Sequence, residues 1–332
     1  MKKLLPLVFL LLLLFSCKKE LTSAEKHAQG LDADPEIIAS LEKFSSECEG
    51  IFESDDGNLI SIYPAHEEED YLENVRVFEE FAKSADVDVF VAVPPRKMDA
   101  LSKSLPDTFP REHSMRLNSL LELTLDKAKF IDLYPALSGK SEYAGELYFK
   151  TDHHWTADGA YLAYVEIADA MGYKPYDKDF FKTEVLLEEF RGSDFTKKNT
   201  SESVDRVIGV YPEGDYTTQL LTSQGEITST FDGFFDYSKA KTNEPYAVYL
   251  GGNAPYVRVS CEGSEREVLL LVRDSFASAL APYLASHFDL VLIDARFFPV
   301  GISQVAKKEG AKKILILENM GSITEHTLRF MW

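Results

Sequence analysis

The sequence predicts an α/β fold in which helices cover both faces of a sheet, and three observations support this. Apolar runs of strand length alternate with segments of helical spacing along most of the chain. The alternation is strictest near the C-terminal end, where strands at 268–272, 290–293 and 314–317 are separated by helices at 276–284 and 302–309. Finally, 45% of the 332 residues are hydrophobic, which is enough for one large packed domain or two small ones.

The first sixteen residues are typical of an export signal rather than of the fold. Lys2 and Lys3 precede an apolar run, Leu4–Phe15, that is too short for a comfortable membrane span. The run ends in Leu-Phe-Ser-Cys, which is similar to a bacterial lipobox and implies cleavage before Cys17 and a lipid on its sulfur. The alternative is an ordinary signal peptide followed by a chance cysteine.

We therefore expect three segments: a signal peptide at 1–16, a lipidated tether at 17–34, and a folded domain at 35–332. A lipid holds a protein at a membrane without spanning it. The expected location is the outer face of the bacterial cytoplasmic membrane or another part of the cell envelope.

The composition excludes several partners. Loss of Lys2 and Lys3 changes the formal net charge from −20 to −22, so neither nucleic acid nor anionic lipid headgroups are expected to bind. Cys48 and Cys261 remain after lipidation; they could form a disulfide outside the cytoplasm or be two unrelated buried thiols.

The N-terminal half of the domain is predicted from apolar spacing, caps and turn residues. Thr156 can cap the last helix of this half, and Gly172 can end it. In chain order we expect a helix from Pro35, a hairpin over 51–63 around Asp56-Gly57-Asn58, a helix over 71–81, a strand over 87–93, a helix over 115–125, a strand over 130–133 and a helix over 156–171.

Residues 174–265 differ from the rest of the domain. Thr, Ser, Asp and Gly are frequent there, and the apolar runs are short. We interpret this stretch as a β-rich insertion that shapes a cleft or as a set of long loops, and we predict a strand at 247–250 within it.

A serine lies where an α/β sheet binds its ligands. Ser275 follows the strand 268–272 and precedes a helix, so it is expected at the carboxyl end of that strand. The helix start offers N–H groups that can stabilise an oxyanion. Alternatively, Asp274 or Ser275 only caps the helix, and capping is the commoner role for such a residue taken alone.

An aspartate and a histidine stand two residues apart in Thr151-Asp-His-His-Trp155. On an extended segment their side chains leave the same face, so Asp152 can orient His154 as the base that a serine needs. The same alternation points His153 to the opposite side, toward packing or a substrate rim. A metal site at this stretch is the competing hypothesis, but the five other histidines are scattered and we expect no metal.

Two segments could supply oxyanion donors. Gly251-Gly252 would let backbone N–H groups approach a ligand closely, and Asn253 carries an amide donor. Asn319, after the last strand, is a second candidate. Either segment could simply be a turn.

Together these residues resemble the DHHW proteins, relatives of the alginate O-acetyltransferase proteins in the SGNH-hydrolase-like superfamily. The resemblance spans roughly residues 35 to 332 and is strongest around 147–163 and 250–298. It is carried by Thr151-Asp-His-His-Trp-Thr156 with Asp158-Gly-Ala160, Gly251-Gly-Asn253, Asp274-Ser-Phe276, Pro282-Tyr-Leu284 and Asp294-Ala-Arg-Phe-Phe298.

The resemblance implies a three-layer α/β/α fold and a triad in the chain order Asp152, His154, Ser275. Ser275 would be the nucleophile, and Gly252, Asn253 and Ser275 itself would form the oxyanion hole. Arg273 stands where ordinary SGNH esterases have a glycine, and it could narrow the site or pair with an acidic sugar. We expect the substrate contacts to include His153, Trp155, Arg273 and Asn319.

The resemblance also implies a place and a substrate class. Such proteins act outside the cytoplasm on acetyl esters of cell-surface polysaccharides, often beside a membrane-bound O-acyltransferase, and no cofactor is expected. The leading hypothesis is an O-acetyltransferase or acetylesterase that forms an acyl-enzyme. The alternative classes are a non-catalytic glycan-binding or scaffold lipoprotein and a metal-dependent hydrolase using Asp152, His153 and His154.

Overall fold

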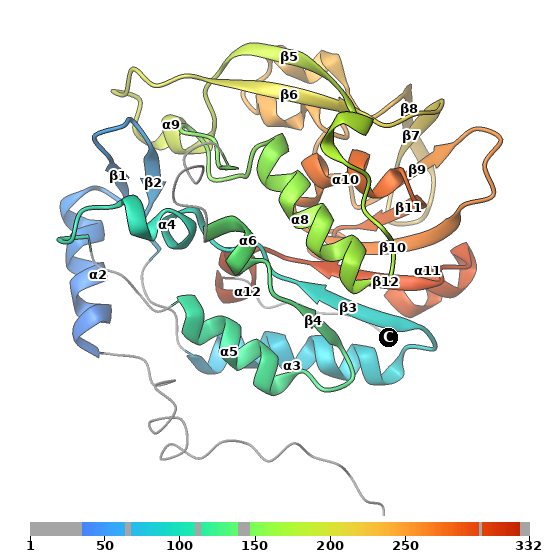
Figure 1. The fold of residues 1–332 in the computed structure, drawn as a ribbon, viewed down its shortest axis with the longest axis horizontal. Helices are drawn as coiled ribbons and strands as arrows, with labels where there is room; N and C mark the ends of the chain where they lie inside the picture. Colours follow the sequence, from blue (N-terminus) through green and yellow to red (C-terminus); the bar gives the residue numbers. More distant parts are fainter. Residues whose placement is uncertain (1–34, 64–67, 110–113, 139–146, 299–300, 326–332) are drawn as a thin grey trace, which may run out of the picture.

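The fold is built on one mixed sheet of eight strands (Figure 1). The computed structural model describes residues 35–63, 68–109, 114–138, 147–298 and 301–325. The strands lie in the order β4 (Lys129–Ile131), β3 (Asp88–Ala92), β12 (Lys313–Leu317), β10 (Glu267–Arg273), β11 (Phe288–Ile293), β9 (Tyr256–Cys261), β7 (Tyr216–Leu221) and β8 (Ile227–Asp232). The first five are parallel, and the last three pair antiparallel.

Helices cover both faces of this sheet and give a three-layer α/β/α domain. One face packs against α6 (Tyr134–Ser138), α8 (Ala157–Ala170) and α10 (Ala277–Ala285). The other packs against α3 (Glu68–Ser84), α5 (Ser114–Thr124), α11 (Ile302–Glu309) and α12 (Met320–Glu325). In Figure 1 the strands β3 and β4 run between α8 and the pair α3 and α5.

The side chains of strand β10 show why helices must cover both faces of the sheet. Leu269 and Leu271 point into the core under α8 and α10, whereas Leu270 and Val272 point into the core under α3 and α11. All four are fully buried. Successive strand side chains leave opposite faces, so an uninterrupted apolar run is stable only when both faces are covered.

The chain changes direction across the sheet at β10. From β10 it passes through α10 to β11 on one side, and it then returns through α11 to β12 on the other side. Ligands of open α/β sheets bind beyond the carboxyl end of a strand at such a switch point. Ser275, two residues after β10, therefore lies at the favoured place.

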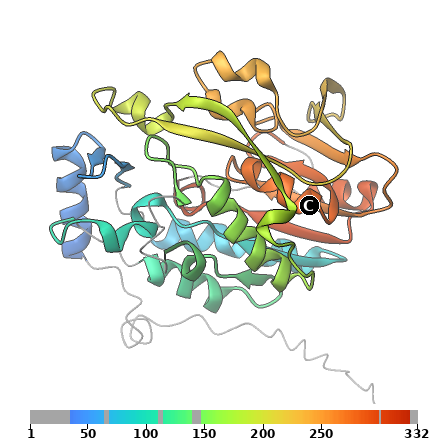
Figure 2. The same cartoon turned by 45° about the horizontal axis from the view of Figure 1, so that its top comes forward.

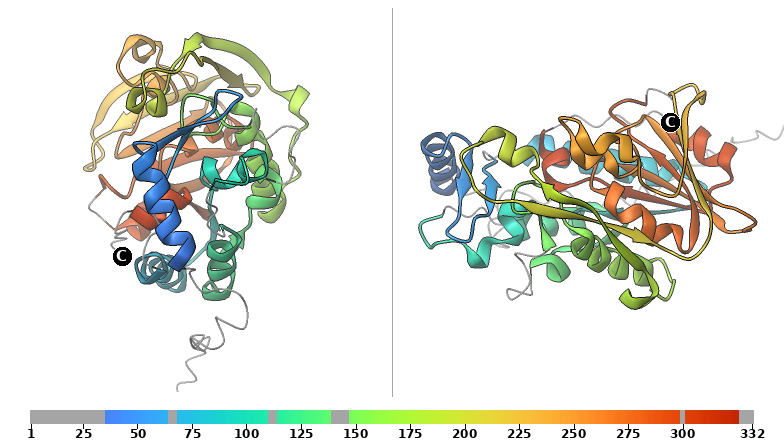
Figure 3. Two further views of the ribbon diagram at one scale, coloured as in Figure 1. Left: turned by 90° about the vertical axis from the view of Figure 1, so that its left-hand side faces the viewer. Right: turned by 90° about the horizontal axis from the view of Figure 1, so that it is seen from above.

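Two additions flank the three layers. At one end, α2 (Pro35–Glu47), the hairpin β1 (Ile51–Glu53) with β2 (Leu59–Ser61), and α4 (Lys97–Ala100) share a small core of their own, followed by η1 (Ser102–Ser104) (Figure 3, left). Above α8 runs an antiparallel ribbon of β5 (Lys182–Phe190) and β6 (Asp205–Tyr211), joined through α9 (Ser193–Lys197) (Figure 2).

The stretch 174–265 contributes to both the ribbon and the sheet. It begins with η2 (Lys178–Phe180), supplies β5, α9 and β6, and then adds β7, β8 and β9 to the edge of the main sheet. The strand predicted at 247–250 is wrong. Residues 247 and 248 end the short 3₁₀ helix η4 (Pro245–Val248), which follows η3 (Tyr237–Lys241). Tyr249 forms an isolated bridge to Phe235, and residue 250 lies in a turn. Pro245 at the start of η4 favours a helical turn over a sheet ladder.

The other predicted helices and strands are confirmed to within a few residues at each end. Thr156 caps α8 by accepting a hydrogen bond from the Gly159 N–H. Cys48 and Cys261 are both free thiols. No helix among the described residues is both long and apolar enough to cross a bilayer. The predicted signal peptide, Cys17 and the tether lie outside the described residues.

Candidate active site

The segment 150–156 enters the site as a series of bends, not as an extended strand. The Asp152 carboxylate folds back on its own backbone and accepts the His154 N–H at 2.9 Å. This local turn is one that aspartate commonly forms. Helix α8 begins directly afterwards, so the segment is held at one end by a capped helix.

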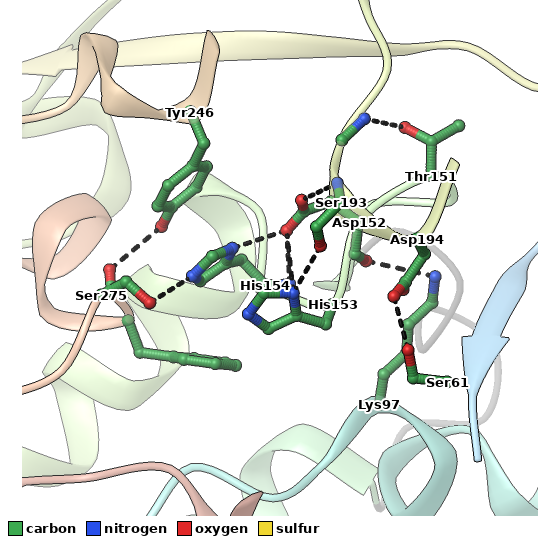
Figure 4. A network of polar contacts seen from close by, with 12 residues as sticks. Ser61, Lys97, Thr151, Asp152, His153, His154, Ser193, Asp194, Tyr246 and Ser275 are labelled. Carbon is green, nitrogen blue, oxygen red and sulfur yellow. Dashed lines mark hydrogen bonds and ion pairs between the residues drawn. The ribbon is translucent and has the colours of Figure 1, made fainter. Parts of the chain in front are cut away.

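Three side chains from two distant parts of the chain form a hydrogen-bonded line (Figure 4). The Asp152 Oδ1 lies 2.5 Å from Nδ1 of His154, and the Nε2 of His154 lies 2.6 Å from Oγ of Ser275. Asp152 and His154 are buried, whereas Ser275 is partly exposed. The Ser275 hydroxyl bonds the imidazole and not a helix N–H, so the structure does not use it as a helix cap.

Asp152 is held from its other side by the first residue of α9. The Ser193 N–H donates to Oδ2 of Asp152 at 2.7 Å. Burial by itself would raise the pKa of Asp152, but the charge of His154 and the hydrogen bonds from His154 and Ser193 outweigh it and hold the pKa well below its usual value. The carboxylate therefore stays ionised and orients the imidazole.

The backbone around Asp152 is fixed by the partly buried Asp205 and the buried Lys97. Asp205 on β6 accepts hydrogen bonds from the N–H groups of Lys150 and Thr151 and from the Thr151 hydroxyl, at 2.6 to 2.8 Å. The Lys97 ammonium donates to the carbonyls of Leu59, Lys150 and Asp152 at 2.6, 2.9 and 3.3 Å. Burial lowers the pKa of Lys97 to about 8.

His153 lies beside His154, so its predicted placement on the opposite side is wrong. The two ring centroids are 4.0 Å apart with a 34° angle between the planes. The alternation of side chains holds only for extended backbone, and this segment bends. Nδ1 of His153 is 2.7 Å from Oγ of Ser193. Burial and the neighbouring His154 lower the pKa of His153, so the ring is neutral near pH 7.

Aromatic residues surround the His154 imidazole, and one of them stacks on it. Tyr246 of η4 stacks on His154 with centroids 3.9 Å apart and planes 6° from parallel. Trp155 is fully buried and donates from Nε1 to the Phe276 carbonyl at 3.0 Å. The prediction that Trp155 contacts substrate is therefore wrong, because the indole lies in the core beneath the site.

Arg273 is also buried and cannot touch a bound substrate, which corrects a second prediction. Its NH1 donates to Oδ1 of the exposed Asn253 at 2.8 Å. A guanidinium only donates, so the amide atom that faces it must be the oxygen, and the Asn253 NH₂ group is left for other partners. Arg273 therefore orients the predicted oxyanion donor.

The two other predicted oxyanion donors are the N–H groups of Gly252 and Ser275, and only the first already has a hydrogen-bond partner among the described residues. Gly252 adopts a left-handed φ of 97°, but its N–H donates to the Tyr249 carbonyl at 3.1 Å and is used within the turn. The Ser275 N–H has no hydrogen-bond partner among the described residues. The geometry thus favours Ser275 N–H and the Asn253 amide over Gly252 as oxyanion donors.

Asn319 supports the serine turn and does not face a substrate. Its backbone N–H and its side-chain amide both donate to Oδ2 of Asp274, and its Oδ1 accepts the N–H groups of Gly321 and Ser322. Asp274 also accepts the Phe276 N–H at 2.9 Å. Because the amide is fully engaged, the prediction that Asn319 binds substrate is wrong.

Asp152, His153 and His154 place one possible ligand atom each within 4.8 Å of one another. Yet both Asp152 oxygens accept hydrogen bonds, and Nδ1 of His153 pairs with Ser193. A cation here would have to replace these bonds. The arrangement is better suited to proton transfer than to metal binding.

Four residues of the site have no obvious signal in the sequence. Gly192, Ser193, Asp205 and Tyr246 all come from the stretch 174–265, where the apolar spacing is irregular. They contact the triad or the backbone directly before Asp152 only because the ribbon and η4 fold back over α8. A single residue in a polar stretch forms no spacing pattern, so the sequence does not mark these four residues as part of the site.

Comparisons with known proteins agree with this fold. A DHHW protein family model matches residues 75–294. A DHHW family protein from Eubacterium siraeum has a TM-score of 0.71 and 22% identity, over 83% of this chain and 92% of that one. Bacillus cereus PatB1 has a TM-score of 0.69 and 20% identity, over 85% and 99%.

A more distant structure, the O-acetyltransferase domain of Pseudomonas putida AlgJ, has a TM-score of 0.51 and 14% identity, over 83% of this chain and 93% of that one. No curated protein matches the sequence. At these identities the solved structures establish the shared SGNH-hydrolase-like α/β/α fold. The family model covers most of the chain, including the Asp-His-His-Trp segment, and the chain therefore belongs to the DHHW protein family.

Proposed function

We propose that this protein transfers acetyl groups to, or removes them from, hydroxyls of a cell-surface polysaccharide through an acyl-enzyme on Ser275. The observation that carries the proposal is the hydrogen-bonded line from Asp152 through His154 to Ser275. A serine hydroxyl is a weak nucleophile until a base accepts its proton, and an oriented imidazole is such a base. A module that only binds glycan has no need of that line.

The proposed reaction has two steps. In the first, Ser275 Oγ attacks the carbonyl carbon of an acetyl ester, its proton passes to Nε2 of His154, and the leaving alcohol takes that proton. In the second, a sugar hydroxyl or water gives its proton to His154 and attacks the acetyl carbon. The bond to Ser275 then breaks, and its oxygen recovers the proton.

The surroundings of the triad support each step. Ionised Asp152 stabilises the imidazolium that forms on His154. The Ser275 N–H and the Asn253 amide are the donors for the negative oxygen of the tetrahedral intermediate. Removal of one such donor from a serine enzyme typically slows catalysis by roughly 10²–10³-fold.

A sulfonyl fluoride and an activated ester test the proposal together. A structure of the related PatB1 is described with a sulfonyl adduct, and we expect phenylmethylsulfonyl fluoride to add one sulfonyl group to this chain. Intact mass would place the adduct on wild type and not on Ser275→Ala, and release of 4-nitrophenol from its acetate would follow the same pattern. Equal behaviour of the two proteins would leave a glycan-binding or scaffold role as the better explanation.

We further propose that the chain works at the cell envelope, held by a lipid on Cys17, beside a membrane-bound O-acyltransferase that supplies the acetyl group. The proposal rests on the sequence of the first 17 residues and on the family. Labelling of cells with an alkyne fatty acid should mark wild type and not Cys17→Ser. If both are labelled equally or neither is, the lipid anchor is wrong.

A further inference from the structure

The doubled histidine suggests a second role beside the triad. We infer that His153, with its proton fixed by Ser193, forms an acceptor subsite that holds a hydroxyl next to the reacting one, and so selects a vicinal diol of the glycan. This inference rests on the proposed function, because it concerns the second step of the same reaction.

The tautomer of His153 follows from its neighbours. Nδ1 lies 2.7 Å from Oγ of Ser193 and 3.7 Å from Oδ1 of the ionised Asp152. The negative carboxylate favours a proton on the nearer ring nitrogen. Nδ1–H therefore donates to Ser193, and Nε2 carries the lone pair.

The free nitrogen is accessible. The His153 side chain is 29% exposed, compared with 7% for His154. Among the described residues, Nε2 of His153 has no hydrogen-bond partner. In Figure 4 the ring edge opposite Ser193 turns toward the side on which Ser275 lies. A neutral acceptor nitrogen beside the nucleophile is suited to bind a hydroxyl.

The two rings lie close enough together to contact two adjacent hydroxyls of one sugar. Their centroids lie 4.0 Å apart. One hydroxyl of a diol can give its proton to Nε2 of His154 and attack the acetyl carbon, while its neighbour donates a hydrogen bond to Nε2 of His153. An alcohol with a single hydroxyl has one O–H and cannot make both contacts, so the pair of rings favours a vicinal diol over a lone alcohol by orientation of the acceptor.

The neutral state of the His153 ring matters in the second step of the proposed reaction. His154 becomes an imidazolium when it takes the acceptor proton. A second positive ring at 4.0 Å would oppose that charge. Because burial lowers the pKa of His153, the ring stays neutral and can accept a hydrogen bond without this repulsion.

The test compares matched acceptors. Wild type would be acetylated with 4-nitrophenyl acetate in the presence of cis-1,2-cyclohexanediol or cyclohexanol, and the ratio of acetylated alcohol to free acetate measured for each. We expect the diol to give a ratio about ten-fold higher, the size of one hydrogen bond. No transfer to the diol, or equal ratios for the two alcohols, would overturn the inference.

Variants separate this subsite from the triad. His153→Phe keeps a flat ring and should abolish the preference for the diol, whereas His153→Gln, whose amide oxygen replaces Nε2, should restore part of it. Ser193→Ala keeps the N–H that holds Asp152 and should weaken the preference. His287→Gln is the control, because the His287 ring bonds Tyr164 away from the site. This variant should keep the wild-type ratio of acetylated alcohol to free acetate.

The outcomes distinguish the two proposals. If wild type is not acylated on Ser275, the proposed function fails. If Ser275 is acylated and His153→Phe keeps the wild-type preference for the diol, only the acceptor subsite fails.

Discussion

Replacement of Gly192 by alanine should disable the triad although none of its three residues is substituted. Gly192 lies directly before α9 with φ −94° and ψ −158°, a backbone conformation that alanine also adopts. Yet a Cβ at this position would lie 2.6 Å from Cγ of Asp152 and closer still to its Oδ2 and Cβ. Real Cβ atoms do not approach so closely, so the Asp152 carboxylate or the α9 turn must move.

The expected loss follows from what Asp152 does. Displacement of the reacting geometry by about 1 Å costs on the order of 10²-fold, and loss of the orienting carboxylate in a serine triad costs about 10⁴-fold. We therefore expect the acylation rate of Ser275 to fall by roughly 10²–10⁴-fold, or about 2.7–5.5 kcal/mol of barrier. Ester hydrolysis and intact-mass labelling would both report it.

Gly209→Ala provides the matched control. Gly209 lies on β6 of the same ribbon, and its added Cβ would press on the side chains of Leu186 and Phe235, not on Asp152. Thermal unfolding of both variants would show any shared loss of stability. If Gly192→Ala is acylated within about three-fold of Gly209→Ala, the view that the ribbon positions the triad is refuted.

Three further predictions follow from buried groups around the site. Arg273→Lys removes the guanidinium that orients Asn253 and should lower kcat by about 10–100-fold with little change in KM, as measured by steady-state kinetics. Arg258→Lys, which alters the distant ion pair with Glu309, is the control and should leave kcat unchanged. Burial raises the pKa of Asp194 from 3.8 to about 6, so the folded state binds more protons than the unfolded state between these values. The free energy of unfolding should therefore fall by up to about 3 kcal/mol as pH rises through that window, and urea unfolding of Asp194→Asn should lack this fall. EDTA should leave ester hydrolysis within about two-fold of its untreated rate, because both Asp152 oxygens, Nδ1 of His153 and both ring nitrogens of His154 are engaged by hydrogen bonds; loss of activity restored by a divalent metal would contradict it.

The sequence by itself determined most of the scaffold. Strands such as Asp88–Ala92 and Lys313–Leu317 are short apolar runs, and α8 has both a capping Thr156 and a following Gly172. These signals are local, because the residues that form them are neighbours in the chain. The candidates Asp152, His154 and Ser275 were visible for the same reason, since each lies in a short recognisable motif.

Only the tertiary structure decided how the site is supported. Ser275 bonds a histidine 121 residues earlier, and Ser193 bonds Asp152 across 41 residues. The first pair depends on how α8 packs beside α10, and the second on how the β5–β6 ribbon packs over α8; no periodic pattern reports either packing. The fold likewise decided that Trp155 and Arg273 are buried and that His153 lies beside His154, because burial and bending depend on what surrounds a side chain rather than on its place in a motif.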